Sequence, residues 1–209
     1  MTDKVTCRLG VLVSGSGTNL QAIIDRIESG DIPATIACVI SNKPNAFALT
    51  RAKKHGIPVV VHENGGFANR QEYDAATVDI LHSYGVNLVI LAGFMRILTN
   101  SMIDSFPNAI INIHPALLPS FPGLHAQQQA LDYGVRYTGC TVHFVDCGTD
   151  TGPIIIQSVV PVEQDDTEES LSAKIQKEEH SVFPAAIKLI SQGRIKVEGR
   201  KVHIMPESC

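Results

Sequence analysis

Short apolar runs alternate with helix-type patterns through the first half of this chain. The expected strands cover residues 9–14, 35–40, 58–61, 86–92 and 109–114, and the expected helices cover residues 18–24, 45–55, 70–84 and 99–106. Strands separated by helices of this kind form βαβ units, in which neighbouring strands run parallel. The sequence therefore predicts a three-layer, Rossmann-like α/β fold with a mostly parallel sheet.

The pattern changes in the last third of the chain. Two expected strands, 141–145 and 154–162, are joined by a short polar loop, so the C-terminal part of the sheet is expected to be antiparallel. A long helix, 166–192, follows, and Pro184 should kink it. Its first residues resemble an N-cap with a reciprocal acidic residue. Gly199 then turns a closing hairpin.

Composition excludes several classes of partner. A net charge of −4 gives no basic surface for nucleic acid or an anionic membrane, so a small-molecule partner is expected. Residues 1–8 lack the apolar run of a secretory signal, and the apolar stretch 86–95 is too short to span a bilayer. The five cysteines form no CxxC pair, as is typical of free thiols in a reducing compartment. We therefore expect a cytoplasmic protein.

A glycine-rich turn follows the first expected strand. Gly15-Ser16-Gly17 leads into a helix that begins near Thr18, and backbone N–H groups at such a helix start bind phosphate. Leu20 stands where a dinucleotide fingerprint has its third glycine, and the chain has no GxxxxGK[ST] element. A phosphorylated metabolite is the expected ligand. A tight turn selected only for packing is the alternative.

Two polar side chains share the end of the expected strand 109–114. Asn112 and His114 alternate with isoleucines and so lie on one face, and Pro115 ends the strand. An amide donor beside an imidazole suits stabilisation of an oxyanion and transfer of a proton. Asp150, in a glycine-rich loop, is expected to orient the imidazole and favour its charged form. A purely structural histidine is the alternative at position 114.

Other chemistries have little support in the sequence. The eight histidines show no HExxH or paired ligand spacing, so no metal site is expected. The chain has no GxSxG nucleophile elbow, and Cys140 and Cys147 have no adjacent base motif. Direct group transfer is therefore favoured over a covalent intermediate.

Six short motifs follow one another between about residue 9 and residue 192. They are 15–23 (GSGTNLQAI), 91–98 (LAGFMRIL), 112–115 (NIHP), 117–120 (LLPS), 122–123 (PG) and 141–145 (TVHFV). Together they resemble the phosphoribosylglycinamide formyltransferases, folate-dependent enzymes of purine synthesis. The resemblance implies a formyltransferase fold. It also implies that the amine of glycinamide ribonucleotide attacks the formyl carbon of the co-substrate 10-formyltetrahydrofolate, which gives N-formylglycinamide ribonucleotide and tetrahydrofolate.

The same resemblance implies roles for single residues. The catalytic group is Asn112, His114 and Asp150. The ribonucleotide is bound by Gly17, Thr18, Asn19, Gln176 and Glu179, and the folate by Arg70, Met95, Arg96, Ile97, Leu98 and Asn112. We expect a single domain, 1–209, with a phosphate-binding half at about 7–106 and a folate and catalytic half at about 107–209. The loop before Asp150 departs from the family pattern at Cys147-Gly148-Thr149.

Three alternatives stay open at this point. Hydrolysis of 10-formyltetrahydrofolate and formylation of initiator methionyl-tRNA would use the same folate. A deformylase is expected to carry a regulatory domain, and a tRNA enzyme a basic C-terminal domain. A non-catalytic nucleotide-binding module would keep the sheet and the turn. The favoured interpretation is a monomer or homodimer that acts on two small molecules, with no nucleic acid or membrane partner.

Overall fold

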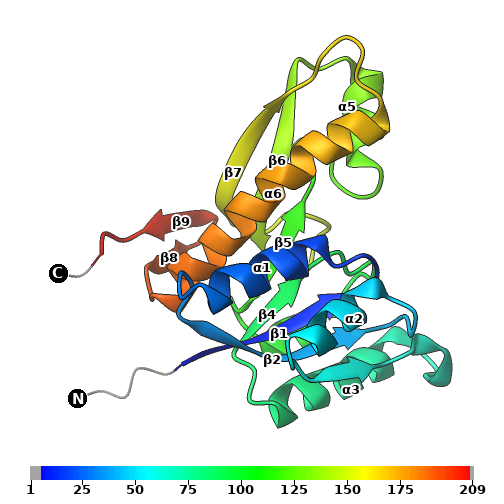
Figure 1. Ribbon diagram of the computed structural model, residues 1–209, viewed down its shortest axis with the longest axis vertical. Helices are drawn as coiled ribbons and strands as arrows, with labels where there is room; N and C mark the ends of the chain where they lie inside the picture. The colour runs from blue at the N-terminus through cyan, green and yellow to red at the C-terminus, as the bar shows by residue number, and fades with distance from the viewer. Residues whose placement is uncertain (1–5, 208–209) are drawn as a thin grey trace.

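A computed structural model describes residues 6–207 of the chain. The strands of its main sheet are β1 (Cys7–Val13), β2 (Ala34–Ser41), β3 (Val59–Val61), β4 (Leu88–Leu91), β5 (Ile110–His114), β6 (Tyr137–Phe144) and β7 (Ile154–Pro161). They lie in the order β3-β2-β1-β4-β5-β6-β7 (Figure 1). Pairs among β1 to β5 are parallel, whereas β6 and β7 pair antiparallel. The predicted mixed sheet is therefore confirmed.

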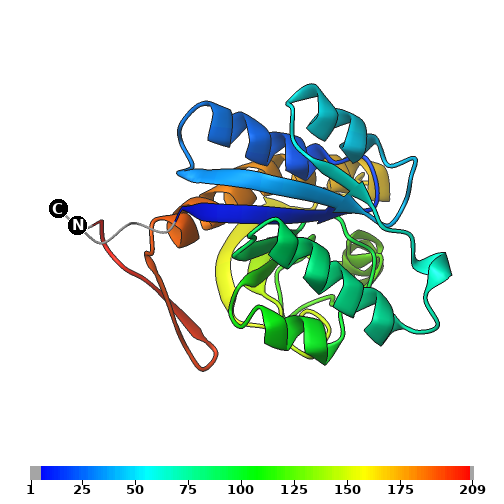
Figure 2. The same cartoon turned by 90° about the horizontal axis from the view of Figure 1, so that it is seen from below.

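Helices cover both faces of this sheet. They are α1 (Thr18–Glu28), α2 (Phe47–Lys54), the 3-10 helix η1 (Asn64–Gly66), α3 (Arg70–Ser83), α4 (Asn100–Ser105), α5 (Ala126–Tyr133) and α6 (Glu168–Ser191). α1, α2 and α6 pack on one face, and α3 and α4 pack on the other, which gives three layers (Figure 2). A hairpin of β8 (Ile195–Glu198) and β9 (Lys201–Ile204) follows α6. Within residues 6–207, no helix has the length and apolar character needed to cross a membrane.

Side chains of β1 point alternately into the two helical layers. Leu9, Val11 and Val13 are fully buried in the core under α1, α2 and α6, whereas Leu12 is fully buried in the core under α3 and α4. Gly10 lies where a Cβ would collide with Leu81 of α3, so the helix packs directly on the strand backbone. A strand that is apolar on both faces is typical of a central member of a parallel sheet.

Two features of residues 115–140 were absent from the sequence-based expectation. α5 (Ala126–Tyr133) lies between His125 and Gly134, and both of these flanking residues have left-handed backbone conformations. β6 begins at Tyr137, earlier than the expected strand at 141–145. Gly139 lies inside β6, where the carbonyl of Ser158 in β7 occupies the place that a Cβ would take.

The cap of α6 also corrects the sequence-based expectation. Thr167 Oγ1 accepts the Ser170 N–H at 3.2 Å, and Ser170 Oγ accepts the Thr167 N–H at 3.0 Å. The expected acidic partner is wrong, because Glu168 and Glu169 are the first two residues after the cap and the reciprocal partner must be the third. Pro184 lies buried inside the helix.

Gly139→Ala is expected to lower the free energy of unfolding by about 1–3 kcal/mol, because the added methyl group overlaps the Ser158 carbonyl of the paired strand. Gly65→Ala is the control, since a Cβ there meets nothing within 4 Å. The control should change the free energy by less than about 0.5 kcal/mol. Urea unfolding measures both. Equal midpoints for the two variants would contradict the close β6–β7 contact.

Candidate active site

The end of β5 lies where the sheet changes from parallel to antiparallel. β4 runs parallel to β5 on one side, and β6 runs antiparallel on the other. In the β5–β6 ladder, Asn112 stands opposite His143 and His114 stands opposite Thr141. Ligands of open α/β sheets bind beyond the carboxyl ends of the parallel strands. The two predicted polar residues of β5 therefore lie at the edge where a ligand is expected.

His114 is nearly enclosed, with 4% of its surface exposed. Its Nδ1 atom lies 3.3 Å from Oδ2 of Asp150, and its Nε2 atom lies 2.8 Å from the carbonyl oxygen of Phe121. Both ring nitrogens therefore face oxygen atoms. A neutral imidazole can donate through one nitrogen, whereas an imidazolium can donate through both. The Asp150 carboxylate and the Phe121 carbonyl are thus positioned to accept one hydrogen bond each from the two ring nitrogens of His114.

Asp150 is held by contacts on both of its carboxylate oxygens. Oδ2 accepts the Gly123 N–H at 2.8 Å in addition to facing His114, and Oδ1 lies 3.7 Å from Nε2 of His143. The residue adopts a left-handed backbone conformation with φ of 55°. Such a conformation in a non-glycine residue costs free energy and persists where neighbouring contacts impose it. The predicted meeting of His114 and Asp150 is present in the structure.

His143 completes this group, although the sequence analysis assigned it no role. It is 2% exposed, and its Nε2 atom lies 3.3 Å from Nδ2 of Asn112. Its Nδ1 atom lies 2.8 Å from the carbonyl oxygen of Phe144. Burial lowers the pKa of the imidazole. The available signal was its place in an alternating strand opposite β5, but that register depends on pairing between distant segments.

A buried hydroxyl fixes the loop that follows β5. Thr141 Oγ1 donates to the carbonyl of Ala116 at 2.7 Å and accepts the N–H of Leu118 at 3.0 Å. Gln157 of β7 donates to the same hydroxyl and to the carbonyl of Leu118, both at 3.0 Å. Two strands therefore hold the start of the loop that brings Phe121 and Gly123 to His114 and Asp150.

The glycine turn between β1 and α1 is formed as expected. Gly17 has φ of 71°, and a Cβ at this position would lie 2.5 Å from Cβ of Ala48 in α2. Only glycine combines that conformation with so close a neighbour. Ser14, just before the turn, donates from Oγ to Asn42 at 2.7 Å and accepts the Met95 N–H at 3.1 Å. The turn is thereby joined to the segments that follow β2 and β4.

The first turn of α1 meets α6 through two side-chain pairs. Gln176 Nε2 donates to Thr18 Oγ1 at 3.1 Å, and Asn19 Nδ2 donates to Glu179 Oε2 at 2.9 Å. Glu179 is 9% exposed. Burial raises the pKa of its carboxyl, and the bond from Asn19 acts in the opposite direction. Four of the five predicted ribonucleotide residues thus form two hydrogen-bonded pairs. The fifth, Gly17, directly precedes Thr18 in the chain.

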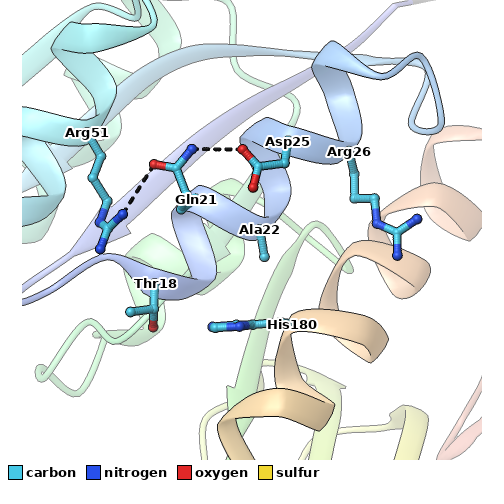
Figure 3. A pocket seen from close by; sticks show the side chains of 7 residues that line it. All are labelled: Thr18, Gln21, Ala22, Asp25, Arg26, Arg51 and His180. Atoms are coloured by element: carbon cyan, nitrogen blue, oxygen red, sulfur yellow. Dashed lines mark hydrogen bonds between the residues drawn. The ribbon is translucent and has the colours of Figure 1, made fainter.

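A cavity of about 400 Å³ adjoins this turn (Figure 3). It is lined by Thr18, Gln21, Ala22, Asp25, Arg26, Arg51 and His180. Arg51 of α2 donates from Nε to the carbonyl of Ser16 at 2.9 Å and from Nη1 to Oε1 of Gln21 at 3.3 Å. A cation therefore braces the glycine turn from the side. The sequence analysis assigned no role to Arg51, because nothing local places α2 against the turn.

A second cavity of about 460 Å³ contains most of the predicted folate residues. Its lining is Asn64, Phe67, Asn69, Arg70, Tyr73, Met95, Arg96 and Ile97. The Arg96 guanidinium lies over the Tyr73 ring, 4.2 Å from its centre, and Met95 and Ile97 are 71% and 64% exposed. The residues of the 64–69 loop carried no motif from which they could be found.

The two other predicted folate residues lie outside this lining. Leu98 is buried in the core with residues of α3 and α4. Asn112 is on β5, next to β4, where Leu91 pairs with it. Because Met95 follows β4 by a few residues, the cavity and Asn112 occupy neighbouring strand ends.

Comparison with known proteins gives consistent results. The family model described as "Formyl transferase" matches residues 7–187. The phosphoribosylglycinamide formyltransferase of Haemophilus influenzae is 44% identical over 197 residues, which cover 94% of this chain and 93% of that protein. The trifunctional purine biosynthetic protein adenosine-3 of Drosophila melanogaster is 48% identical over 188 residues. This match covers 89% of the chain and only 14% of that longer protein.

The fold matches solved structures equally well. The crystal structure of glycinamide ribonucleotide transformylase 1 from Symbiobacterium toebii superposes with a TM-score of 0.95 at 50% sequence identity. The match covers 96% of this chain and 95% of that one. Sequence and structure agree over nearly the whole length, and the chain belongs to the formyl transferase family.

Proposed function

We propose that this protein transfers the formyl group of 10-formyltetrahydrofolate to the amine of glycinamide ribonucleotide, a step of de novo purine synthesis. The observation that carries the proposal is the group formed by Asn112 and His114 of β5 and by Asp150, whose carboxylate lies 3.3 Å from His114. The names of the relatives that match over nearly full length support it. We further propose that it acts in the cytoplasm as a single domain, either as a monomer or as a homodimer.

The proposed reaction is direct transfer through a tetrahedral intermediate. The amine lone pair forms the new C–N bond, and the carbonyl electrons move onto the formyl oxygen. Asn112 Nδ2–H and a protonated His114 are the proposed donors to that oxyanion, because both are neutral or positive donors fixed before the reaction. Collapse of the intermediate breaks the bond to the folate nitrogen, which takes up a proton. The amine nitrogen loses one.

His114 is the proposed acid for this proton exchange. Asp150 occupies its Nδ1 side at 3.3 Å, so Nε2 is the atom available to the substrates. The Phe121 carbonyl now accepts from Nε2 at 2.8 Å and would be displaced when substrate binds. Asp150 keeps the ring oriented and stabilises its positive charge.

The glycine turn and α6 are the proposed ribonucleotide site. Backbone N–H groups at the start of α1 face the phosphate, with Gly17, Thr18 and Asn19 at the turn and Gln176 opposite. Glu179 is placed to accept from ribose hydroxyls or the substrate ammonium, and Asn19 already holds one of its oxygens. Arg51 braces the carbonyl side of the turn.

The second cavity is the proposed folate site. Exposed Met95 and Ile97 offer apolar surface to the flat pterin ring, with Leu98 buried behind them and Asn112 at the reacting end. Arg70 is positioned at the start of α3 to meet the anionic glutamate tail, and Arg96 adds a second cation to the lining.

The first prediction concerns the reaction itself. The purified protein, mixed with 10-formyltetrahydrofolate, is expected to consume the formyl group only when glycinamide ribonucleotide is present, with one formylated ribonucleotide formed for each folate consumed. Absorbance of the folate product and mass spectrometry of the ribonucleotide measure the two sides. Equal consumption without ribonucleotide would instead identify a hydrolase. No consumption under either condition would point to a non-catalytic binding module.

Asp150→Asn is expected to lower kcat by about 10²–10⁴-fold, because the neutral amide no longer stabilises the charged His114 ring. Asp79→Asn, on the exposed side of α3, is the control and should retain wild-type kcat. Steady-state kinetics with both substrates measures the effect. Wild-type turnover by the Asp150 variant would remove this carboxylate from the mechanism.

Gln176→Ala is expected to raise KM for the ribonucleotide about 3- to 10-fold, the effect of losing one hydrogen bond, and to leave KM for the folate unchanged. The reason is its contact with Thr18 at the proposed phosphate turn. Gln128→Ala is the matched control, because Gln128 bonds only to Asp132 on the surface of α5 within the described residues. A rise in folate KM alone would place the ribonucleotide elsewhere.

A further inference from the structure

The Asn112 amide has one side-chain hydrogen bond within residues 6–207, to Nε2 of His143 at 3.3 Å. An amide group has a donor end and an acceptor end of nearly the same shape, so its orientation depends on its hydrogen-bond partners. The proposed reaction needs the donor end at the formyl oxygen. The partner of Asn112 therefore decides whether the residue can stabilise the oxyanion.

The tautomer of His143 follows from its other nitrogen. Nδ1 lies 2.8 Å from the carbonyl oxygen of Phe144, and a carbonyl oxygen only accepts, so Nδ1 carries the proton. A neutral imidazole has a single N–H. Nε2 therefore presents a lone pair to Asn112, and this lone pair requires the NH₂ end of the amide.

The ring is kept neutral by its surroundings. Burial lowers the pKa of His143, and its bond to the Phe144 carbonyl acts in the opposite direction. Of the charged groups around it, Asp150 and Asp146 raise the pKa, whereas His114 lowers it. The net pKa lies below the ordinary value for histidine. The lone pair on Nε2 is thus present at neutral pH.

A reversed Asn112 amide would place its oxygen against the lone pair of His143 Nε2. Nε2 of His143 carries the lone pair, and Oδ1 of Asp150 lies 3.7 Å from the same nitrogen. That distance is too long for a hydrogen bond, and the tautomer leaves no proton on Nε2 to donate to the carboxylate. Repulsion between the amide oxygen and the Nε2 lone pair therefore disfavours the reversed orientation.

We propose that His143 is a positioning residue, whose neutral imidazole, anchored by the Phe144 carbonyl, orients the Asn112 amide so that an N–H faces the formyl oxygen. One of the two N–H bonds of the amide is used by His143, and the second is left for the oxyanion. This inference rests on the proposed formyl transfer. In this role His143 acts through Asn112.

Two variants separate this role from simple packing. Glutamine can place an amide oxygen near the position of Nε2, whereas asparagine reaches only the position of Nδ1. His143→Asn is expected to lower kcat about 10- to 100-fold, less than complete removal of an oxyanion donor, with both KM values nearly unchanged. His143→Gln should recover most of this loss. A purely structural role would not distinguish the two variants in this way.

A double-mutant cycle gives the sharper readout. Asn112→Ala removes the group through which His143 acts, so His143→Asn added to it should change kcat by less than about 2-fold. Multiplied losses in the double variant would overturn the proposal and show that His143 acts independently of Asn112. Circular dichroism and thermal midpoints check that the compared variants are folded.

The tautomer can be measured in the folded wild-type protein without turnover. ¹⁵N NMR of the histidine rings, assigned with the help of the His143→Asn spectrum or by sequential assignment, should show protonated Nδ1 and unprotonated Nε2 at neutral pH. An Nε2–H tautomer or an imidazolium would overturn the proposal. A wild-type protein that fails the formyl-transfer assay would contradict the proposed function, whereas this spectrum tests the orientation of Asn112 separately.

Discussion

The antiparallel pairing of β6 with β5 is the constraint on which the candidate active site depends. It places His143 opposite Asn112 and Thr141 opposite His114. Thr141 then fixes the loop after β5, and the turn after β6 returns Asp150 to the same place. One change of strand direction therefore assembles side chains from three separate segments. A wholly parallel sheet would send the chain after β5 into a crossover helix.

The packing of α1 along α6 is the second long-range requirement. Gln176 meets Thr18, and Lys188 of α6 pairs with Asp31, which follows the end of α1. Glu179 is buried between these points, where an isolated carboxylate would be costly, and the Asn19 amide offsets part of that cost. Residues more than 150 positions apart are thus held at the proposed phosphate site before any ligand arrives.

Much of the fold was predictable because its signals are local. The period of apolar residues identifies β1 and α1, and the conformation of Gly17 fits the expected turn. The strand expected at 141–145 begins earlier in the structure, at Tyr137, and so includes Gly139. Only the β6–β7 pairing reveals the Ser158 carbonyl that excludes a side chain there.

The same distinction applies to the candidate site. His114 and Asp150 were found through residue chemistry and a family resemblance, and the structure brings them together. The contributions of His143 and Arg51 depend on tertiary contacts, a cross-strand bond and a brace from α2, which no sequence window contains. The aromatic lining at Phe67 and Tyr73 likewise requires a loop to fold back on α3.

The two histidines near Asp150 differ in the hydrogen-bond partners of their ring nitrogens. His114 has an oxygen acceptor at each nitrogen, so a second proton gains a partner there. His143 has a carbonyl at one nitrogen and an amide donor at the other, so a second proton would lose a hydrogen bond and would charge a buried ring near His114. Two adjacent imidazolium ions would repel each other in this enclosed space. A neutral His143 therefore keeps its hydrogen bond with Asn112 and avoids this repulsion.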